Sequence, residues 1–229
     1  MTLKINSLAP DFKAKTSEGD ISFHEWLGDS WGVLFSHPKD FTPVCATEIS
    51  ALSASEDEFK KRNCKLIGLS VDSLESHFDW LSEMEETYGS RIEFPIIADK
   101  NLYVSKLYNM LPADTVVEGP RSATDNATVR TVYIISPDLK IKMMMSYPMT
   151  TGRDVEELLR VIDSIQLTSG HKVATPVNWR EGQDVIIAAS VLITVAIMAI
   201  SGVPFYVITN ALPVILIGIA VADSIHIYS

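Results

Sequence analysis

The sequence predicts an α/β protein in which a layered domain is followed by a hydrophobic helical hairpin. Three observations support this prediction. Strand and helix patterns alternate through residues 1–184. These residues also hold 47 of the 48 charged side chains, whereas residues 185–222 hold none. We therefore expect two parts, a domain over residues 1–184 and a transmembrane hairpin over residues 185–229.

The first half of the domain alternates strand, helix, strand, helix. Residues 31–36 form a short apolar run typical of a buried strand, and residues 48–62 have the apolar spacing of an amphipathic helix. A second strand is expected over residues 65–71. Asp72 or Ser73 can cap the helix that follows, which Gly89 ends.

The second half continues the alternation. A short strand is expected over residues 94–98 and a brief helix over residues 102–108. Two further strands, residues 129–136 and 141–146, are joined by a turn at Pro137 and Asp138, and a helix over residues 154–167 closes the domain. This order predicts helices that cover a mixed sheet.

The hydrophobic tail is long enough for nearly two membrane spans. Residues 185–222 are 38 residues without a charge, and one span needs roughly 20. Gly202 and Pro204 interrupt the run and are suited to a turn between two helices. Lys172 and Arg180 precede the first span, which places the domain on the cytoplasmic side. The alternative is a helix buried in the core of a soluble protein.

Composition excludes several classes of protein. The net charge is −10, which argues against nucleic-acid binding, because that function needs a basic face. Two cysteines, Cys45 and Cys64, are too few for a disulfide framework. The five histidines show no metal-ligand spacing, so no metal site is expected. The N-terminal residues contain no signal-peptide run, so we expect a cytoplasmic domain.

The chemistry centres on Cys45. The loop of residues 37–45 lies between a buried strand and a helix, which places Cys45 in the first helical turn, where the helix dipole favours the thiolate. Thr42, three residues earlier, can present its hydroxyl beside the sulfur, and Pro38 and Pro43 restrict the loop backbone. Taken alone, such a cysteine is more often a small buried hydrophobic residue than a nucleophile.

The pattern Pro38-x-x-x-Thr42-x-x-Cys45 resembles the active-site motif of the peroxiredoxins. The longer run of residues 34–45 is similar to that of the 1-Cys peroxiredoxins of the peroxiredoxin-6 type, and the similarity extends to about Val185. Further matching motifs are residues 66–72, 129–130, 147–153 and 173–179. The resemblance implies a thioredoxin-like fold and a homodimer.

The resemblance also implies roles for individual residues. Cys45 would be the peroxidatic cysteine, Thr42 would orient the peroxide, Pro38 would shield the pocket, and Arg130 would pair with the thiolate. An arginine cannot lose its proton, so it can stabilise both the thiolate and the charge that develops during the reaction. The alternative for Arg130 is a surface arginine at a strand edge, and its place in the family pattern favours the catalytic role. His37 could assist the reaction or only pack.

The implied activity is that of an antioxidant oxidoreductase, a thiol-dependent peroxidase acting on hydrogen peroxide and on organic or lipid hydroperoxides. Its product at Cys45 is a sulfenic acid. Cys64 precedes a buried strand and is poorly placed to meet Cys45, so we interpret it as structural. An external thiol, glutathione or a thioredoxin-type protein, must then reduce the sulfenic acid, and no prosthetic cofactor is expected.

A second candidate site has the G-x-S-x-G form at Gly28-x-Ser30-x-Gly32. The nucleophile elbow needs a strand before the serine, whereas here the expected strand follows it. The resemblance nevertheless implies a phospholipase A2 activity that would use Ser30, His24 and Asp138. The alternative is that Ser30 lies in a turn before a strand and Asp138 in a hairpin turn.

The tail departs from the peroxiredoxin pattern. Residues 202–226 are similar to a membrane hairpin of RND-type exporters, and the similarity stops part-way through a helix at Ser229. One expectation is a true fusion, in which the truncated hairpin tethers the peroxidase domain to a membrane. The other is that the fusion is an artefact of sequence assembly or of the gene model. A third functional hypothesis is an inert peroxiredoxin-like domain fused to an exporter fragment.

Overall fold

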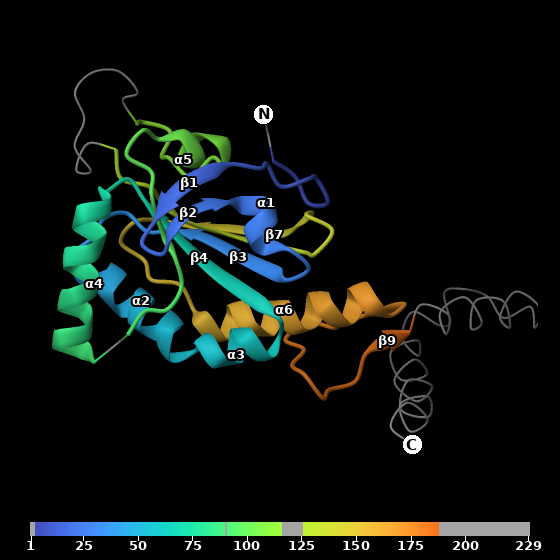
Figure 1. The fold of residues 1–229 in the computed structure, drawn as a ribbon. Helices are drawn as coiled ribbons and strands as arrows, with labels where there is room; N and C mark the ends of the chain where they lie inside the picture. Colours follow the sequence, from blue (N-terminus) through green and yellow to red (C-terminus); the bar gives the residue numbers. More distant parts are fainter. Residues whose placement is uncertain (1–2, 90, 116–125, 188–229) are drawn as a thin grey trace, which may run out of the picture. The chain divides into compact units, whose positions relative to one another are not determined.

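The computed structural model describes residues 3–89, 91–115 and 126–187, and the chain divides into two compact units, Met1–Glu156 and Glu157–Ser229. The first unit is built on a seven-stranded mixed sheet. Its strands in spatial order are β2 (Gly19–Ser22), β1 (Lys13–Thr16), β5 (Ile96–Ala98), β4 (Cys64–Ser70), β3 (Trp31–Ser36), β6 (Arg130–Ile135) and β7 (Ile141–Tyr147). Figure 1 labels β1, β2, β3, β4 and β7. The prediction of an α/β architecture with a mixed sheet is therefore confirmed.

The centre of the sheet consists of three parallel strands, β3 (Trp31–Ser36), β4 (Cys64–Ser70) and β5 (Ile96–Ala98). Side chains of β3 and β4 are almost all buried, which explains why both strands are continuous apolar runs in the sequence. The strand β6 (Arg130–Ile135) pairs antiparallel with β3, and β7 (Ile141–Tyr147) forms the edge. The predicted bounds of β3 match the observed ones, and those of the other four strands differ from them by at most two residues at either end.

The sequence analysis missed the N-terminal hairpin and the helix after it. The strands β1 (Lys13–Thr16) and β2 (Gly19–Ser22) pair antiparallel, and α1 (Phe23–Leu27) follows directly. Each strand has only four residues, and in β1 only the side chain of Thr16 is buried. The alternation of buried and exposed residues is therefore too short to be recognised in the sequence. The hairpin joins the sheet through a single pairing of Thr16 with Ile97 of β5.

The helix predicted over residues 48–62 is wrong in both its start and its continuity. Two helices replace it, α2 (Pro43–Ala54) and α3 (Glu56–Lys61), separated at Ser55. The apolar periodicity begins late because Pro43 and Cys45, which occupy the first turn, carry no amphipathic pattern. Pro43 at the first helical position is compatible with an early start, since its missing N–H has no partner there in any helix.

The remaining helices of the first unit agree with prediction. The helix α4 (Leu74–Tyr88) begins where Ser73 Oγ accepts a hydrogen bond from the Ser76 amide at 3.2 Å. It ends at Gly89, whose φ of +61° lies in the left-handed region that favours glycine. The helix α5 (Tyr103–Leu107) is the brief helix expected after β5, and α2 contacts both α3 and α4.

The core of the first unit contains an aromatic cluster beside the N-terminal hairpin of β1 and β2. Phe12 stacks on Phe23 with ring centroids 4.6 Å apart, and Tyr108 packs edge-on to both rings. Each of the three is buried. Burial of such rings stabilises the docking of the N-terminal segment that the strand pattern alone does not predict.

The second unit contains most of α6 (Val155–Gly170) and a two-stranded sheet, β8 (Val173–Ala174) with β9 (Ile186–Ile187). Trp179 is buried there, and its indole N–H donates to the Gln183 carbonyl oxygen at 2.9 Å. Ile186 and Ile187, expected at the start of the hydrophobic hairpin, form a strand instead. The rest of that hairpin lies outside the described residues, and within the described part of the chain no helix is long and apolar enough to cross a membrane.

Candidate active site

Cys45 is the third residue of α2, and its side chain is fully buried. Thr42 is the residue before the helix, in extended conformation, and its carbonyl oxygen accepts a hydrogen bond from the Ala46 amide at 2.9 Å. The thiol therefore lies in the first turn of the helix, where the N–H groups have no intrahelical partners and favour an anion.

Arg130, the first residue of β6, brings a positive charge to the sulfur. Its Nη1 donates to Cys45 Sγ across 3.4 Å, and its Nε donates to the Met149 carbonyl oxygen at 2.8 Å. The guanidinium is buried, and these two contacts help to fix its position. A fixed cation at this distance stabilises a thiolate relative to a thiol.

The structure adds Glu48 and Arg153 to this site, and the sequence analysis missed both. Glu48 lies three residues after Cys45 on α2 and accepts hydrogen bonds from Nη1 of Arg130 and from Arg153. Arg153 donates from Nε at 2.9 Å, from Nη2 at 3.0 Å and from its backbone amide at 2.8 Å. The spacing of three residues from Cys45 was the available signal for Glu48, and the matching motif of residues 147–153 was the signal for Arg153.

The Glu48 carboxylate stays ionised because of its two arginine partners. Burial of the carboxyl opposes ionisation, but the hydrogen bonds and charge of Arg153, together with the charge of Arg130, outweigh it and hold the pKa of Glu48 below its usual value. Two guanidinium groups thus face one carboxylate, and the cluster retains one positive charge beside the sulfur. That surplus charge is suited to balance a thiolate.

Pro38 and Thr42 lie in the loop that leads into α2. Pro38 is buried, and the Thr42 hydroxyl donates to the Lys39 carbonyl oxygen at 3.0 Å. We expected this hydroxyl beside the sulfur, and the structure gives it a partner within the loop. The lone pairs of its oxygen stay available to a substrate hydroxyl, since the hydrogen bond uses only the proton.

His37 is buried at the end of β3 and belongs to a polar cluster. Its Nε2 lies 2.9 Å from Asp40 Oδ1, and Asp40 Oδ2 lies 2.7 Å from Nδ1 of His77. His37, Asp40 and Asp72 offer ligand atoms within 4.8 Å of one another, which is compatible with a metal ion. These oxygens already accept hydrogen bonds, Asp72 from the Ser70 hydroxyl and the Asp40 amide, so a cation would have to displace them.

Cys64 is the first residue of β4 and pairs with Trp31 of β3. Its side chain is buried, and this burial raises the pKa of the Cys64 thiol to about 12. At neutral pH the thiolate form is therefore negligible, and the residue is a poor nucleophile.

Ser30, His24 and Asp138 are not joined to one another by hydrogen bonds. The Ser30 hydroxyl donates to Asn63 Oδ1 at 3.0 Å, and His24 Nε2 lies 2.8 Å from the Ala9 carbonyl oxygen. Asp138 forms an ion pair with Lys140 at 2.8 Å, and with the Ser136 hydroxyl this lowers the pKa of Asp138 to about 2. Ser30 precedes β3 and Asp138 lies between β6 and β7, as the structural alternative predicted.

Comparison with protein families gives two matches along the chain. The AhpC/TSA family matches residues 5–144, and the C-terminal domain of 1-Cys peroxiredoxin matches residues 164–191. The peroxiredoxin PRX1 of Saccharomyces cerevisiae mitochondria is 50% identical over 192 residues, which are 82% of this chain and 72% of that protein. Rat peroxiredoxin-6 is 47% identical over 190 residues, 81% of this chain and 83% of that protein.

Solved structures agree. A mutant of peroxiredoxin 6 from Arenicola marina superposes with a TM-score of 0.75 at 42% identity, covering 82% of this chain and 84% of its own. A yeast mitochondrial 1-Cys peroxiredoxin, described in terms of thiol resolution through glutathione and thioredoxin systems, has a TM-score of 0.76 at 49% identity, covering 82% and 88%. The expected thioredoxin-like peroxiredoxin fold is thus confirmed.

Proposed function

This chain belongs to the AhpC/TSA family and, within it, to the 1-Cys peroxiredoxins, and from that premise we propose that Cys45 is its peroxidatic cysteine. The protein is a thiol-dependent peroxidase. The observation that supports the assignment of Cys45 is the 3.4 Å contact between Arg130 Nη1 and Cys45 Sγ.

The proposed step is an attack of the Cys45 thiolate on the terminal oxygen of hydrogen peroxide or of an organic or lipid hydroperoxide. The S–O bond forms while the O–O bond breaks, the leaving oxygen takes up a proton, and Cys45 becomes a sulfenic acid. Arg130 stabilises the negative charge as it moves from sulfur to the leaving oxygen. In this proposal Thr42 orients the peroxide and buried Pro38 limits the entry of water.

Reduction of the sulfenic acid needs a thiol from outside the chain. Cys64 is buried and has a strongly raised pKa, so it is unsuited to be a resolving nucleophile. An external thiolate attacks the sulfenic sulfur, water leaves, and a second thiol reduces the mixed disulfide. We assign the reductant to glutathione or a thioredoxin-type protein, because thiol resolution in the similar yeast mitochondrial 1-Cys peroxiredoxin proceeds through glutathione and thioredoxin systems.

We propose in addition that the enzyme is a cytoplasmic homodimer and that the part of residues 185–229 that follows β9 associates with a membrane as a hairpin similar to that of RND-type exporters. The dimer is proposed from family membership. The membrane association is supported by the 38 uncharged residues 185–222. Lys172 and Arg180, which precede this stretch, support the cytoplasmic placement of the catalytic domain.

The decisive experiment compares Cys45→Ser with Cys64→Ser in a peroxide-consumption assay. We expect Cys45→Ser to abolish thiol-dependent peroxide reduction and Cys64→Ser to keep most of it. Equal loss in both variants would indicate a two-cysteine cycle and would contradict the assignment.

A further inference from the structure

The loop that leads into α2 contains a buried carboxylate, Asp40, that no step of the proposed reaction uses. Its side chain is 1% exposed, and both of its oxygens have histidine partners. Oδ1 lies 2.9 Å from His37 Nε2, and Oδ2 lies 2.7 Å from His77 Nδ1. A buried charge is costly unless it is paired, and here two pairings meet on one residue.

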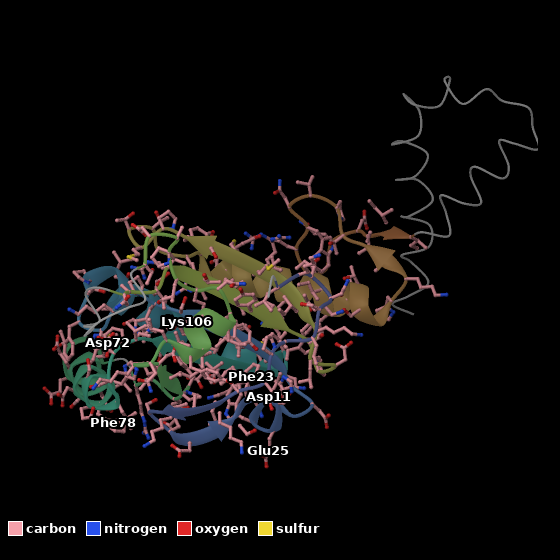
Figure 2. All side chains as sticks on the ribbon, turned by 90° about the horizontal axis from the view of Figure 1, so that it is seen from above. Asp11, Phe23, Glu25, Asp72, Phe78 and Lys106 are labelled. Carbon is pink, nitrogen blue, oxygen red and sulfur yellow. The ribbon has the colours of Figure 1, made fainter. Side chains whose placement is uncertain are left out.

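These contacts connect the end of β3, the loop of residues 37–42 and the first turn of α4. His37 follows β3, whereas His77 and Ser76 lie in the first turn of α4, and the Ser76 hydroxyl also donates to Asp40 Oδ2 at 2.9 Å. The Asp40 amide donates to Asp72 Oδ2 at 3.0 Å, just before α4. Figure 2 shows Asp72, together with Phe78 of α4, at one end of this unit. Asp40 therefore fastens the loop of residues 37–42 to α4.

The positions of the protons follow from acceptors that cannot donate. His77 Nε2 lies 3.2 Å from the Ile97 carbonyl oxygen, so Nε2 carries a proton. Hydrogen bonds and charge from His37 and His77 outweigh burial and hold the pKa of Asp40 well below its usual range, so both carboxylate oxygens accept. His77 therefore donates from Nδ1, and His37 donates from Nε2.

This arrangement places one ionised carboxylate between two imidazole rings that donate to it. His37 Nδ1 is buried and has no hydrogen-bond partner among the residues that the structure describes, so the bond to Asp40 is the one that orients this ring. A charge-assisted hydrogen bond is roughly twice as strong as a neutral one, so the ionised Asp40–His77 pair holds the loop more firmly than an uncharged pair of the same shape.

The loop needs these stabilising contacts, because its backbone adopts an unfavourable conformation at Phe41, just after Asp40. Phe41 has a φ of +55°, in the left-handed region that non-glycine residues rarely adopt, and its side chain is half exposed. Thr42 and the first turn of α2, with Cys45, follow directly. Any relaxation of Phe41 would move the start of α2 and with it the sulfur.

We propose that Asp40 is a positioning residue for Cys45, whose carboxylate, shared between His37 and His77, fastens the loop of residues 37–42 to α4 and keeps the first turn of α2 in its reactive conformation. This inference rests on the proposed role of Cys45. It concerns a residue that touches neither the sulfur nor the substrate and acts through the loop.

The test uses Asp40→Asn in the full-length protein. Asparagine has the same shape, accepts from His37 Nε2 and donates to His77 Nδ1, which must then give up its proton. The matched control is Asp99→Asn, which removes a carboxylate of similar burial that accepts from the amides of Val104 and Ser105 at the start of α5. A circular dichroism spectrum and a thermal melt of each variant show that it is folded.

We expect Asp40→Asn to lower the rate constant of Cys45 oxidation by peroxide about tenfold at pH 7.5, the equivalent of one weakened charge-assisted bond. Alkylation of Cys45 by a bulky maleimide, followed by peptide mass spectrometry, should become faster, because the loop opens more often. Asp99→Asn should match the wild type in both measurements.

A pH profile separates positioning from packing. The groups that face Asp40 are His37 from the loop and His77 from α4, with the Asp72 carboxylate at its backbone amide. In Asp40→Asn the amide NH₂ group takes the place of a carboxylate oxygen beside His77 Nδ1, so a proton on Nδ1 sets two donors against each other. The activity of the variant relative to the wild type should therefore fall further between pH 7 and 5.

Each outcome decides the inference. An Asp40→Asn variant with wild-type oxidation rate, alkylation rate and pH profile would overturn it, and so would an equal effect of Asp99→Asn. A lower rate with unchanged maleimide reactivity and an unshifted pH profile would reduce Asp40 to a packing residue and would also overturn it. The maleimide measurement does not depend on peroxidase activity, so failure of the Cys45 assignment, seen with Cys45→Ser, is distinguishable.

Discussion

At Cys45 the surrounding charges and hydrogen bonds decide whether the residue reacts or only packs. Cys45 and Cys64 are both buried, free thiols at the start of a regular element. Cys45 has a helix N-terminus and the guanidinium of Arg130, whereas burial of Cys64 raises its pKa to about 12. Burial alone therefore does not separate the two thiols. The direct contact from Arg130 does, because at Cys64 the charge of Arg62 does not outweigh burial.

We predict that Arg130→Met slows alkylation of Cys45 by iodoacetamide at neutral pH by about tenfold or more. Methionine fills part of the space but leaves the thiolate without its cation, so the thiolate fraction falls. The measurement is the alkylation rate of wild type and variant between pH 5 and 9, with Arg160→Met, a residue that pairs with Glu157, as the control. Curves that superimpose would mean that Arg130 does not act on the sulfur.

The Glu48 carboxylate makes the free energy of unfolding depend on pH in the acidic range. Its folded-state pKa is below its ordinary value, so its ion pairs stabilise the folded protein above that value of about 4.5 and are lost as the pH falls below it. We predict that Glu48→Gln lowers the free energy of unfolding by about 3 kcal/mol at pH 7, since it leaves two buried guanidinium groups unpaired. Urea unfolding from pH 7 to 3 should show the two proteins converging, and a constant gap would contradict the argument.

At the scale of elements, the ends of helices position the chemistry. The helix α2 begins at Pro43, five residues before its apolar pattern does, and this early start is what places Cys45 in the first turn. The helix α4 begins at the Ser73 cap, three residues before Ser76 and four before His77, which both bind Asp40. Both helices thus present their N-terminal turns to the same loop.

We predict that Ser73→Ala lowers the free energy of unfolding by about 1 kcal/mol, because the Ser76 amide loses its acceptor. Ser82→Ala, in the exposed middle of the same helix, is the matched control and should leave stability unchanged or slightly higher, since alanine is the better helix former. Urea denaturation of both variants gives the comparison. Equal changes in the two would show that the cap contributes nothing.

At the scale of the whole molecule, the chain combines a catalytic domain rich in charged side chains with a stretch, residues 185–222, that has none. The matches to peroxiredoxin families end at residue 191, and residues 188–229 lie outside the described structure. The strand β9 uses Ile186 and Ile187, so the second unit extends into the stretch that the sequence analysis gave to the hairpin. A boundary for experiments therefore belongs after residue 191.

We predict that the full-length protein sediments with membranes and resists a carbonate wash, whereas residues 1–191 stay in the supernatant. The physical reason is the length of the uncharged stretch, which nearly suffices for two spans. Expression in a bacterial host, fractionation and immunoblotting of both forms give the comparison. A full-length protein that remains in the supernatant as a folded dimer would show that the tail packs against protein.

The sequence by itself determined the central strands, the long helix α4 and the motif that carries the proposed peroxidatic cysteine. Buried parallel strands are continuous apolar runs, and the helix ends carry their own signals in Ser73 and Gly89. The loop motif Pro38, Thr42 and Cys45 is local too, since its members lie within eight residues. Local rules of burial, capping and backbone restriction suffice for such features.

Only the tertiary structure decided which charges meet. Glu48 and Arg153 are 105 residues apart, and Asp40 and His77 are 37 apart, so no periodic pattern connects them. The N-terminal hairpin went unrecognised for the same reason, because its short strands are stabilised by pairing with a strand far along the chain. Sheet pairing brings such residues together and removes them from water, and in that buried setting a paired charge controls its neighbours.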